Sequence, residues 1–133
     1  MLEPEWLDLD LILEIHGLIL RRYGGAPGLR DLGLLQSALA RPLQLHKFDS
    51  SADLHSLAAS YANGIVRNHP FVDGNKRTGF LSAYTFLRFN GWYLTATEPD
   101  AVRSMLGLAA ATLTEEEFSD WLRGHSEPVS SGP

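Results

Sequence analysis

Cysteine is absent from this chain of 133 residues, so disulfides and thiolate chemistry are both excluded. No apolar run is long enough to span a membrane, and the first residues lack the basic-then-apolar layout of a secretion signal. We therefore expect a cytoplasmic protein that has no contact with the membrane.

Positive charge is also in short supply. The chain carries 11 lysine and arginine residues against 16 aspartate and glutamate residues, for a formal net charge of −5. A general nucleic-acid-binding surface needs a broad basic patch, so we expect no direct binding to nucleic acid. In such an acidic chain, two adjacent cations, Lys76 and Arg77, point to a local function rather than to a general basic surface.

Helical periodicity, by contrast, runs through almost the whole sequence. Apolar residues recur at helical spacing in six segments, most of them opened by a capping side chain and closed by glycine, asparagine or proline. These segments start near Leu7, Asp31, Asp53, Asn75, Thr97 and Thr114. The pattern predicts a compact all-α bundle of about six helices. We expect one domain over residues 1–125 and a disordered tail, "SEPVSSGP", over residues 126–133.

The second of these helices is predicted to end before Pro42, because proline disfavours a helical conformation in the preceding residue. Leu43, Leu45 and Phe48 then alternate with polar residues in "PLQLHKF". This alternation indicates a short extended flap, which could hold a target peptide as an added strand. An ordinary loop is the alternative.

The segment "RNHPFVDGNKRTGF", from Arg67 to Phe80, interrupts the helical pattern. His69 precedes a proline and is therefore expected to have an extended backbone. Phe71 is apolar and could bury to anchor the segment. Asp73-Gly74-Asn75 is typical of a turn, and the glycine permits close approach of a ligand.

Lys76 and Arg77 follow this turn at the start of the next predicted helix. Cations at a helix N-terminus face the positive end of its dipole, which is unfavourable unless an anion is bound. The free backbone N–H groups of a helix N-terminus form an anion site themselves. We therefore predict that a polyphosphate binds here.

The neighbouring residues then acquire chemical roles. Asp73 is the nearest carboxylate for the Mg²⁺ that accompanies nucleotide phosphates. The Asn75 amide could donate to a phosphate oxygen, and His69 could take a proton from an attacking hydroxyl. Together with Lys76 and Arg77, these residues predict a site for phosphoryl or nucleotidyl transfer.

Simpler interpretations exist for each residue. His69 could be a structural residue at a helix end, Asp73 a turn or capping residue, and Lys76-Arg77 a solvated pair. A phosphate-binding P-loop is rejected, because the Gly-Lys-Ser/Thr order and a parallel-sheet pattern are both missing. The remaining histidines show no metal-site spacing and are treated as structural or surface residues: His16, His46, His55 and His125.

The segment "HPFVDGNKRTG" resembles the signature of the Fic/Doc superfamily, His-Pro-Phe-x-Asp/Glu-Gly-Asn-Gly-Arg-x-x-Arg. The sequence departs from it at Lys76, where the signature has glycine, and at Phe80, where it has arginine. Both departures resemble the Doc (death-on-curing) toxin branch, which reads Gly-Asn-Lys-Arg-Thr. The segment "YGGAPGLRDLGLLQSALARP" (23–42) is also similar to that branch.

This resemblance implies a Fic-like fold with a helix-loop-helix active site. It also implies a bacterial toxin that acts as a protein kinase, moving the γ-phosphate of ATP to a threonine, with elongation factor Tu as the substrate. By matching position, His69 is the general base and Asp73 the Mg²⁺ ligand. Residues 74–77 (Gly74, Asn75, Lys76 and Arg77) bind phosphates. Alternatives are AMP transfer to a protein hydroxyl, the commoner Fic reaction, and a non-catalytic binding module.

Inhibition is expected to come from a second protein. Fic proteins often carry an inhibitory helix with the pattern Ser/Thr-x-x-x-Glu-Gly/Asn, but no glutamate in this sequence precedes glycine or asparagine. The resemblance then implies a small Phd-like antitoxin, whose disordered C-terminal segment folds onto the toxin.

Overall fold

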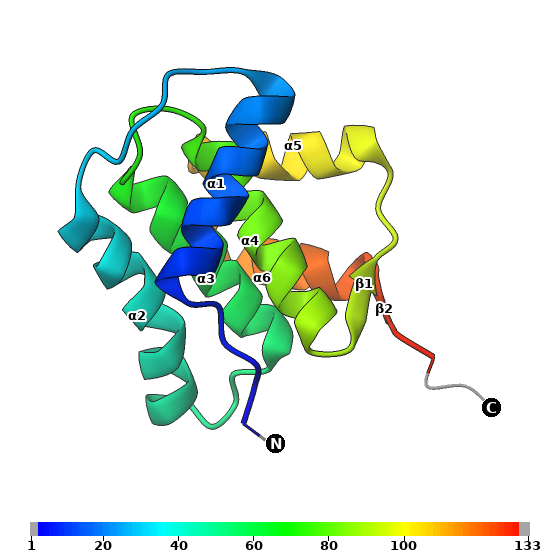
Figure 1. Cartoon of the computed structure of the whole chain (residues 1–133). Helices are drawn as coiled ribbons and strands as arrows, with labels where there is room; N and C mark the ends of the chain where they lie inside the picture. The colour runs from blue at the N-terminus through cyan, green and yellow to red at the C-terminus, as the bar shows by residue number, and fades with distance from the viewer. Residues whose placement is uncertain (1–2, 131–133) are drawn as a thin grey trace.

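The computed structural model describes residues 3–130 and is built from six helices and two short strands (Figure 1). The helices are α1 (Leu9–Tyr23), α2 (Leu32–Phe48), α3 (Leu54–Asn68), α4 (Asn75–Phe89), α5 (Glu98–Ala109) and α6 (Glu115–Gly124). The strands are β1 (Trp92–Leu94) and β2 (Ser126–Pro128). The predicted all-α bundle is thus confirmed.

The centre of the bundle is the pair α3 and α4, with α2 and α6 packed on α3 and α1 on α4 (Figure 1). Small residues bring the helix backbones together. A Cβ added at Gly64 would lie 3.2 Å from the Cα of Ala38 on α2, and one at Gly79 would lie 3.0 Å from the carbonyl oxygen of Ala62 on α3. Such close contacts fix α2 and α4 against α3, and with them the loop of residues 69–74 that joins α3 to α4.

Side-chain caps open five of the six helices. Asp8, Asp31, Asp53, Thr97 and Thr114 each accept a hydrogen bond from a backbone N–H in the first turn of the following helix. These bonds satisfy backbone donors that have no partner inside the helix. Helix α4 is different: its N-cap is Gly74, which offers no side chain.

The flap predicted over residues 43–48 is wrong. Helix α2 continues through Pro42 to Phe48, so this segment forms its last turns. Proline removes one helical hydrogen bond, but the Pro42 ring is less than 2% exposed. Leu39 and Leu45, on either side, also pack against the core. Burial of apolar surface therefore compensates for the lost bond.

The disordered tail predicted over residues 126–133 is wrong for β2. This strand pairs antiparallel with β1, placing Tyr93 opposite Glu127. The ring of His55 on α3 fixes the pair, since its Nε2 lies 2.8 Å from Ser126 Oγ and its ring meets Trp92 edge-on at 4.6 Å. Residues 131–133 of the predicted tail lie outside the described residues.

None of the helices within residues 3–130 combines the length and the apolar character needed to cross a membrane.

Candidate active site

His69 is the C-cap of α3 and has a left-handed backbone, with φ 53° and ψ 52°. The expectation of an extended backbone is therefore wrong. This conformation is uncommon for a residue other than glycine, although histidine adopts it more often than most. Its N–H still donates to the carbonyl of Ile65, 3.0 Å away. The side chain is exposed and lines a cleft of about 600 Å³ with Asp73, Lys76 and Arg77.

The loop after His69 is held from the inside by Phe71, which is 1% exposed. Asn75 holds the backbone of Phe71 in both directions: its Oδ1 accepts from the N–H of Phe71 at 3.0 Å, and its Nδ2 donates to the Phe71 carbonyl at 2.9 Å. Asn75 is itself 4% exposed. This geometry makes the Asn75 amide a support for the loop, and the predicted phosphate contact of that amide would compete with these bonds.

Asp73 is exposed at the mouth of the cleft and its carboxylate is anchored by the backbone. One oxygen accepts from the N–H of Gly74 at 2.8 Å, and the other from the N–H of Ala26 at 3.2 Å. The bonds from Ala26 and Gly74 lower the pKa of Asp73, and the nearby imidazoles of His16 and His69 lower it further. The carboxylate is therefore charged at neutral pH, as a cation ligand must be.

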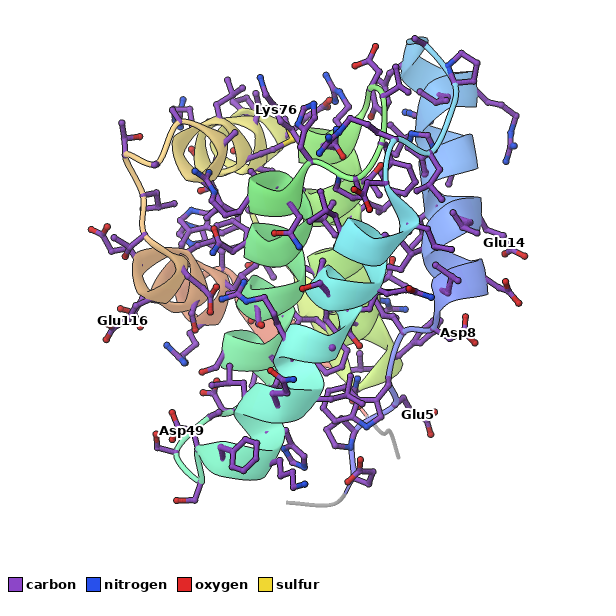
Figure 2. All side chains as sticks on the ribbon, turned by 90° about the vertical axis from the view of Figure 1, so that its left-hand side faces the viewer. Glu5, Asp8, Glu14, Asp49, Lys76 and Glu116 are labelled. Carbon is purple, nitrogen blue, oxygen red and sulfur yellow. The ribbon has the colours of Figure 1, made fainter. Side chains whose placement is uncertain are left out.

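The N-terminus of α4 opens into the same cleft. Gly74 takes φ 81° and supplies no capping oxygen, so the first N–H groups of α4 have no side-chain acceptor at this position. Lys76 is exposed and Arg77 is half-buried in this first turn. Figure 2 shows Lys76 at one end of the molecule, while the labelled carboxylates, among them Glu14 and Glu116, lie elsewhere. The arrangement is that of an anion site.

Arg77 lies over the ring of Tyr23, the last residue of α1, with 3.8 Å between the guanidinium carbon and the ring centroid. A cation above an aromatic face is attracted by the ring's quadrupole. Tyr23 therefore holds the guanidinium at the edge of the cleft, where both residues are part of the lining.

Residues 6–87 match the Fic/DOC family, a range that contains the loop, all of α3 and all but the last two residues of α4. The chain is 40% identical over 93 residues to the toxin Doc of Mycolicibacterium smegmatis, covering 69% of each chain. It is 31% identical over 112 residues to the protein kinase doc of Escherichia phage P1, covering 84% of this chain and 88% of the relative.

The chain belongs to the Fic/DOC family. Both relatives are Doc proteins, so the predicted resemblance to the Doc branch is confirmed. Residues 69–80, the loop and the start of α4, are accordingly the segment in which this Fic/DOC protein carries the family signature.

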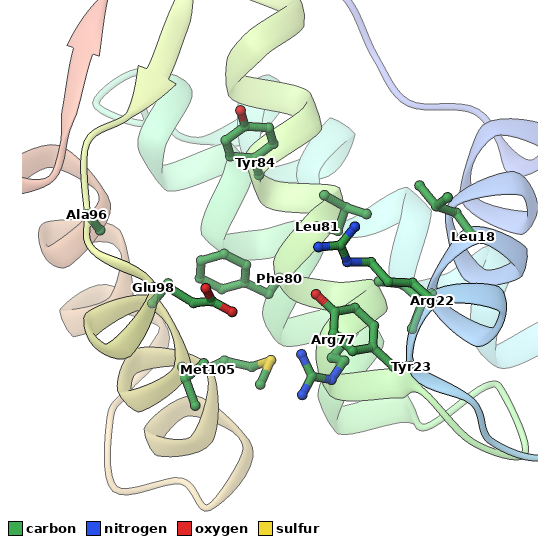
Figure 3. Close-up of a pocket in the computed structure, with 13 residues that line it drawn as sticks. Leu18, Arg22, Tyr23, Arg77, Phe80, Leu81, Tyr84, Ala96, Glu98 and Met105 are labelled. Carbon is green, nitrogen blue, oxygen red and sulfur yellow. The ribbon is translucent and has the colours of Figure 1, made fainter.

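A second, mostly apolar groove of about 630 Å³ adjoins the cleft and shares Ile19, Tyr23, Arg77 and Met105 with it. Figure 3 shows it between α1, α4 and α5. The groove contains Phe80, the residue that replaces the last arginine of the Fic signature. Phe80 also meets Phe118 edge-on at 6.2 Å, so the departure from the signature belongs to the packing of α4 on α6.

Sequence reasoning did not identify three residues that contact the site: His16, Tyr23 and Arg30. His16 donates from Nε2 to the carbonyl of Asp73 at 2.8 Å. Arg30 donates to the carbonyl of His69 at 2.7 Å. Tyr23 and Arg30 lie in the segment that resembles the Doc branch, which was the available signal for them. His16 lies 57 residues from its partner, and nothing in the local pattern pointed to it.

Proposed function

We propose that this protein is a toxin-type protein kinase that transfers the γ-phosphate of ATP to a threonine hydroxyl of a target protein. The observation that carries this proposal is the start of α4, where the N-cap is a glycine with no capping oxygen and two cations lie in the first turn. An anionic ligand would satisfy the free N–H groups, the helix dipole and both side-chain charges together.

In this proposal His69 is the general base. Its imidazole takes the proton of the acceptor hydroxyl, the hydroxyl oxygen bonds to the γ-phosphorus, and ADP leaves. The N–H groups at the start of α4, with Lys76 and Arg77, stabilise the charge on the transferred phosphoryl group. Gly74 allows the positive φ of 81° with which the loop enters α4, and Asn75 holds the loop through the backbone of Phe71.

Asp73 is the proposed ligand for Mg²⁺. Within residues 3–130, no group of three or more histidine, aspartate or glutamate side chains is arranged to hold a metal. One charged carboxylate fits Mg²⁺ nevertheless, because this ion usually binds through one or two carboxylates together with substrate phosphates and water. When bound, the ion would neutralise phosphate charge.

Two observations favour γ-phosphate transfer over AMP transfer. Lys76 fills space that glycine leaves open in the Fic signature, and Phe80 removes the arginine expected to hold the outer phosphates. The name of one relative, protein kinase doc, is consistent with this choice. By the same resemblance, we propose elongation factor Tu as the substrate and inhibition of translation as the result.

We also propose a cognate antitoxin as partner, with the apolar groove as its docking site. Leu18 and Tyr84 in this groove are 48% and 36% exposed. Figure 3 shows Arg22 and Arg77 on the side of the groove opposite Glu98. An amphipathic antitoxin segment with an acidic residue facing the two arginines would fit this surface and would also cover Arg77.

The test is to incubate the protein with ATP, Mg²⁺ and a bacterial lysate, and to identify the modified protein by mass spectrometry. A phosphate-sized increment on a threonine is expected, and an AMP-sized increment would instead establish the Fic reaction. The His69→Ala variant should lose transfer and still bind Mg-ATP. A parent that binds nucleotide but modifies nothing, and inhibits growth no more than His69→Ala, would indicate a binding module.

A further inference from the structure

Residues 28–31, here called the strap, pair with the loop of residues 69–74. Leu29 and Phe71 form an antiparallel bridge, flanked by hydrogen bonds from Val72 N–H to the carbonyl of Gly28 (3.0 Å) and from Arg30 N–H to that of Pro70 (2.7 Å). These bonds fix residues 70–72 of the loop. They do not involve His69, whose carbonyl is held in a different way.

The side chain of Arg30 reaches back to the end of α3. Its Nε donates to the carbonyl of His69 at 2.7 Å, and its Nη2 to the carbonyl of Asn68 at 3.0 Å. The guanidinium fork thus holds two successive carbonyls at the negative end of the helix dipole. Because the backbone N–H of Arg30 is itself bonded to Pro70, the arginine is fixed on both sides of His69.

The backbone of His69 needs such support. A left-handed conformation at a residue with a Cβ is costly and persists only where its surroundings enforce it. The carbonyl carbon and Cβ of His69 are both bonded to its Cα. With the backbone held on both sides of His69, a bond to its carbonyl also restrains the direction of Cα–Cβ. The imidazole itself is exposed, so burial does little to orient it.

We propose that Arg30 is a positioning residue for His69: it holds the general base in the left-handed conformation that aims the imidazole into the cleft. This inference rests on the proposed function of His69. The side-chain hydrogen bonds of Arg30 go to the carbonyls of Asn68 and His69, and not to Asp73 or to the anion site at the start of α4. Its removal should therefore affect His69 and leave nucleotide binding intact.

A purely structural role for Arg30 is the competing explanation, and the chain offers a matched control. Arg123 ties the opposite end of α3 through Asp53, at 2.8 Å and 3.0 Å, remote from the cleft. Removing Arg123 destabilises the same helix but leaves His69 in place. If Arg30 acted only through the stability of α3, Arg30→Ala and Arg123→Ala should therefore reduce activity to a similar extent.

The experiment measures kcat, the KM for Mg-ATP and the unfolding midpoint for Arg30→Ala, Arg30→Lys and Arg123→Ala. Misplacing a reacting group by about 1 Å costs on the order of 100-fold. For Arg30→Ala we expect kcat to fall by at least about 10-fold, with KM within about twofold of the parent, and partial recovery on adding millimolar guanidinium. Arg30→Lys keeps the charge without the fork and should fall in between. Arg123→Ala should lose stability without losing kcat at temperatures where it is folded.

A second readout does not depend on activity. The imidazole resonances of His69, assigned by comparison with His69→Ala, should shift in Arg30→Ala and stay unchanged in Arg123→Ala. If the parent transfers no phosphate, the kinase proposal fails while these resonances still decide the role of Arg30. Unshifted resonances, or a loss of kcat no larger than that of Arg123→Ala, would overturn the inference. If Arg30→Ala does not fold, the same criteria apply to Arg30→Lys.

Discussion

The imidazole of His16 lies flat against the ring of Phe71, with 3.8 Å between the ring centroids and 8° between the planes. The same imidazole contacts the carbonyl of Asp73 through Nε2, at 2.8 Å. A carbonyl oxygen only accepts, so Nε2 carries the hydrogen and the tautomer is fixed. Helix α1 therefore holds both the apolar and the polar side of the loop with one side chain.

Replacing His16 should loosen the loop. His16→Ala removes the stacking contact and leaves the Asp73 carbonyl without its donor, for an expected loss of about 2–4 kcal/mol of unfolding free energy. His16→Phe keeps the stack and loses only the donor, so its loss should be about 1–2 kcal/mol. Urea unfolding measures both, and Mg²⁺-dependent activity should fall in the same order.

His46→Ala is the control for this pair. His46 lies near the end of α2, 3.6 Å from Glu3 and remote from the loop, so its removal should leave activity unchanged. Equal losses of activity in His16→Ala and His46→Ala would show that the contact with Phe71 has no special role.

The helices themselves were predictable because their signals are local. Asp8, Asp31 and Asp53 each precede an amphipathic stretch, and each caps the helix that the stretch forms. The exception was α2, which passes through Pro42. The outcome there depends on burial of the proline ring, and burial is a property of the assembled bundle.

The grouping of residues at the candidate site was predictable where they are neighbours in sequence. His69, Asp73 and Lys76 fall within eight positions, and the loop brings them to one cleft. The supports of the loop come from far along the chain: Arg30 and His16 act from the strap and from α1. Such contacts depend on how the helices pack, and no local periodicity encodes them. For Asn75, the residue type fits both a phosphate ligand and a loop support, so the sequence alone could not decide between these two roles.

Gly25→Ala should displace the carboxylate of Asp73. A Cβ at Gly25 would lie 2.8 Å from Oδ2 of Asp73, closer than real Cβ atoms come to other heavy atoms, and the φ of +125° disfavours any side chain. Since Asp73 is the proposed Mg²⁺ ligand, we expect the Mg²⁺ concentration for half-maximal activity to rise by at least about 10-fold, or about 1.4 kcal/mol. A titration of activity against Mg²⁺ measures this.

Gly91→Ala provides the matched comparison, because Gly91 also has a positive φ, +90°, but no atom within 4 Å of an added Cβ. It should cost about 1 kcal/mol of stability from backbone strain and leave the Mg²⁺ titration unchanged. The interpretation of Gly25 would be wrong if both variants shifted the titration equally.

Asp53 should make the stability of the protein sensitive to acid. Burial alone would raise the pKa of this carboxyl, but hydrogen bonds from Arg123 and from Ser56 outweigh it and hold the pKa well below the usual 3.8. A group whose pKa is lower in the folded state stabilises that state above its unfolded pKa, and the contribution is lost as the pH falls through the folded pKa. The contribution of Asp53 should therefore be complete at pH 7 and fade below about pH 4.

Asp53→Asn tests the predicted direction of this pH dependence. The variant keeps a capping side chain but loses the ion pair, which is partly exposed, so we expect a loss of about 1 kcal/mol at pH 7. When unfolding is measured at about pH 3, the difference in unfolding free energy between the variant and the parent should be smaller. Glu14→Gln, an exposed change on α1, should show no such pH dependence. A gap that widened in acid would contradict the assignment of charge to Asp53.

The last prediction concerns the direction in which the nucleotide binds. Lys76 and Phe80 lie one turn apart on α4, and Lys76→Gly with Phe80→Arg restores the Fic signature at both positions. The new arginine would enter the groove that also holds Glu98, where it could bind outer phosphates. We expect the double variant to lose phosphate transfer by at least about 10-fold and to give an AMP-sized increment on the target in the mass spectrum.

Phe80→Arg alone removes the edge-on contact with Phe118 and so should cost about 1–2 kcal/mol of stability. Phe80→Leu, which keeps an apolar side chain without adding a cation, separates this loss from any change of reaction. Phosphate-sized increments at the parental rate in the folded double variant would mean that Lys76 and Phe80 do not set the orientation.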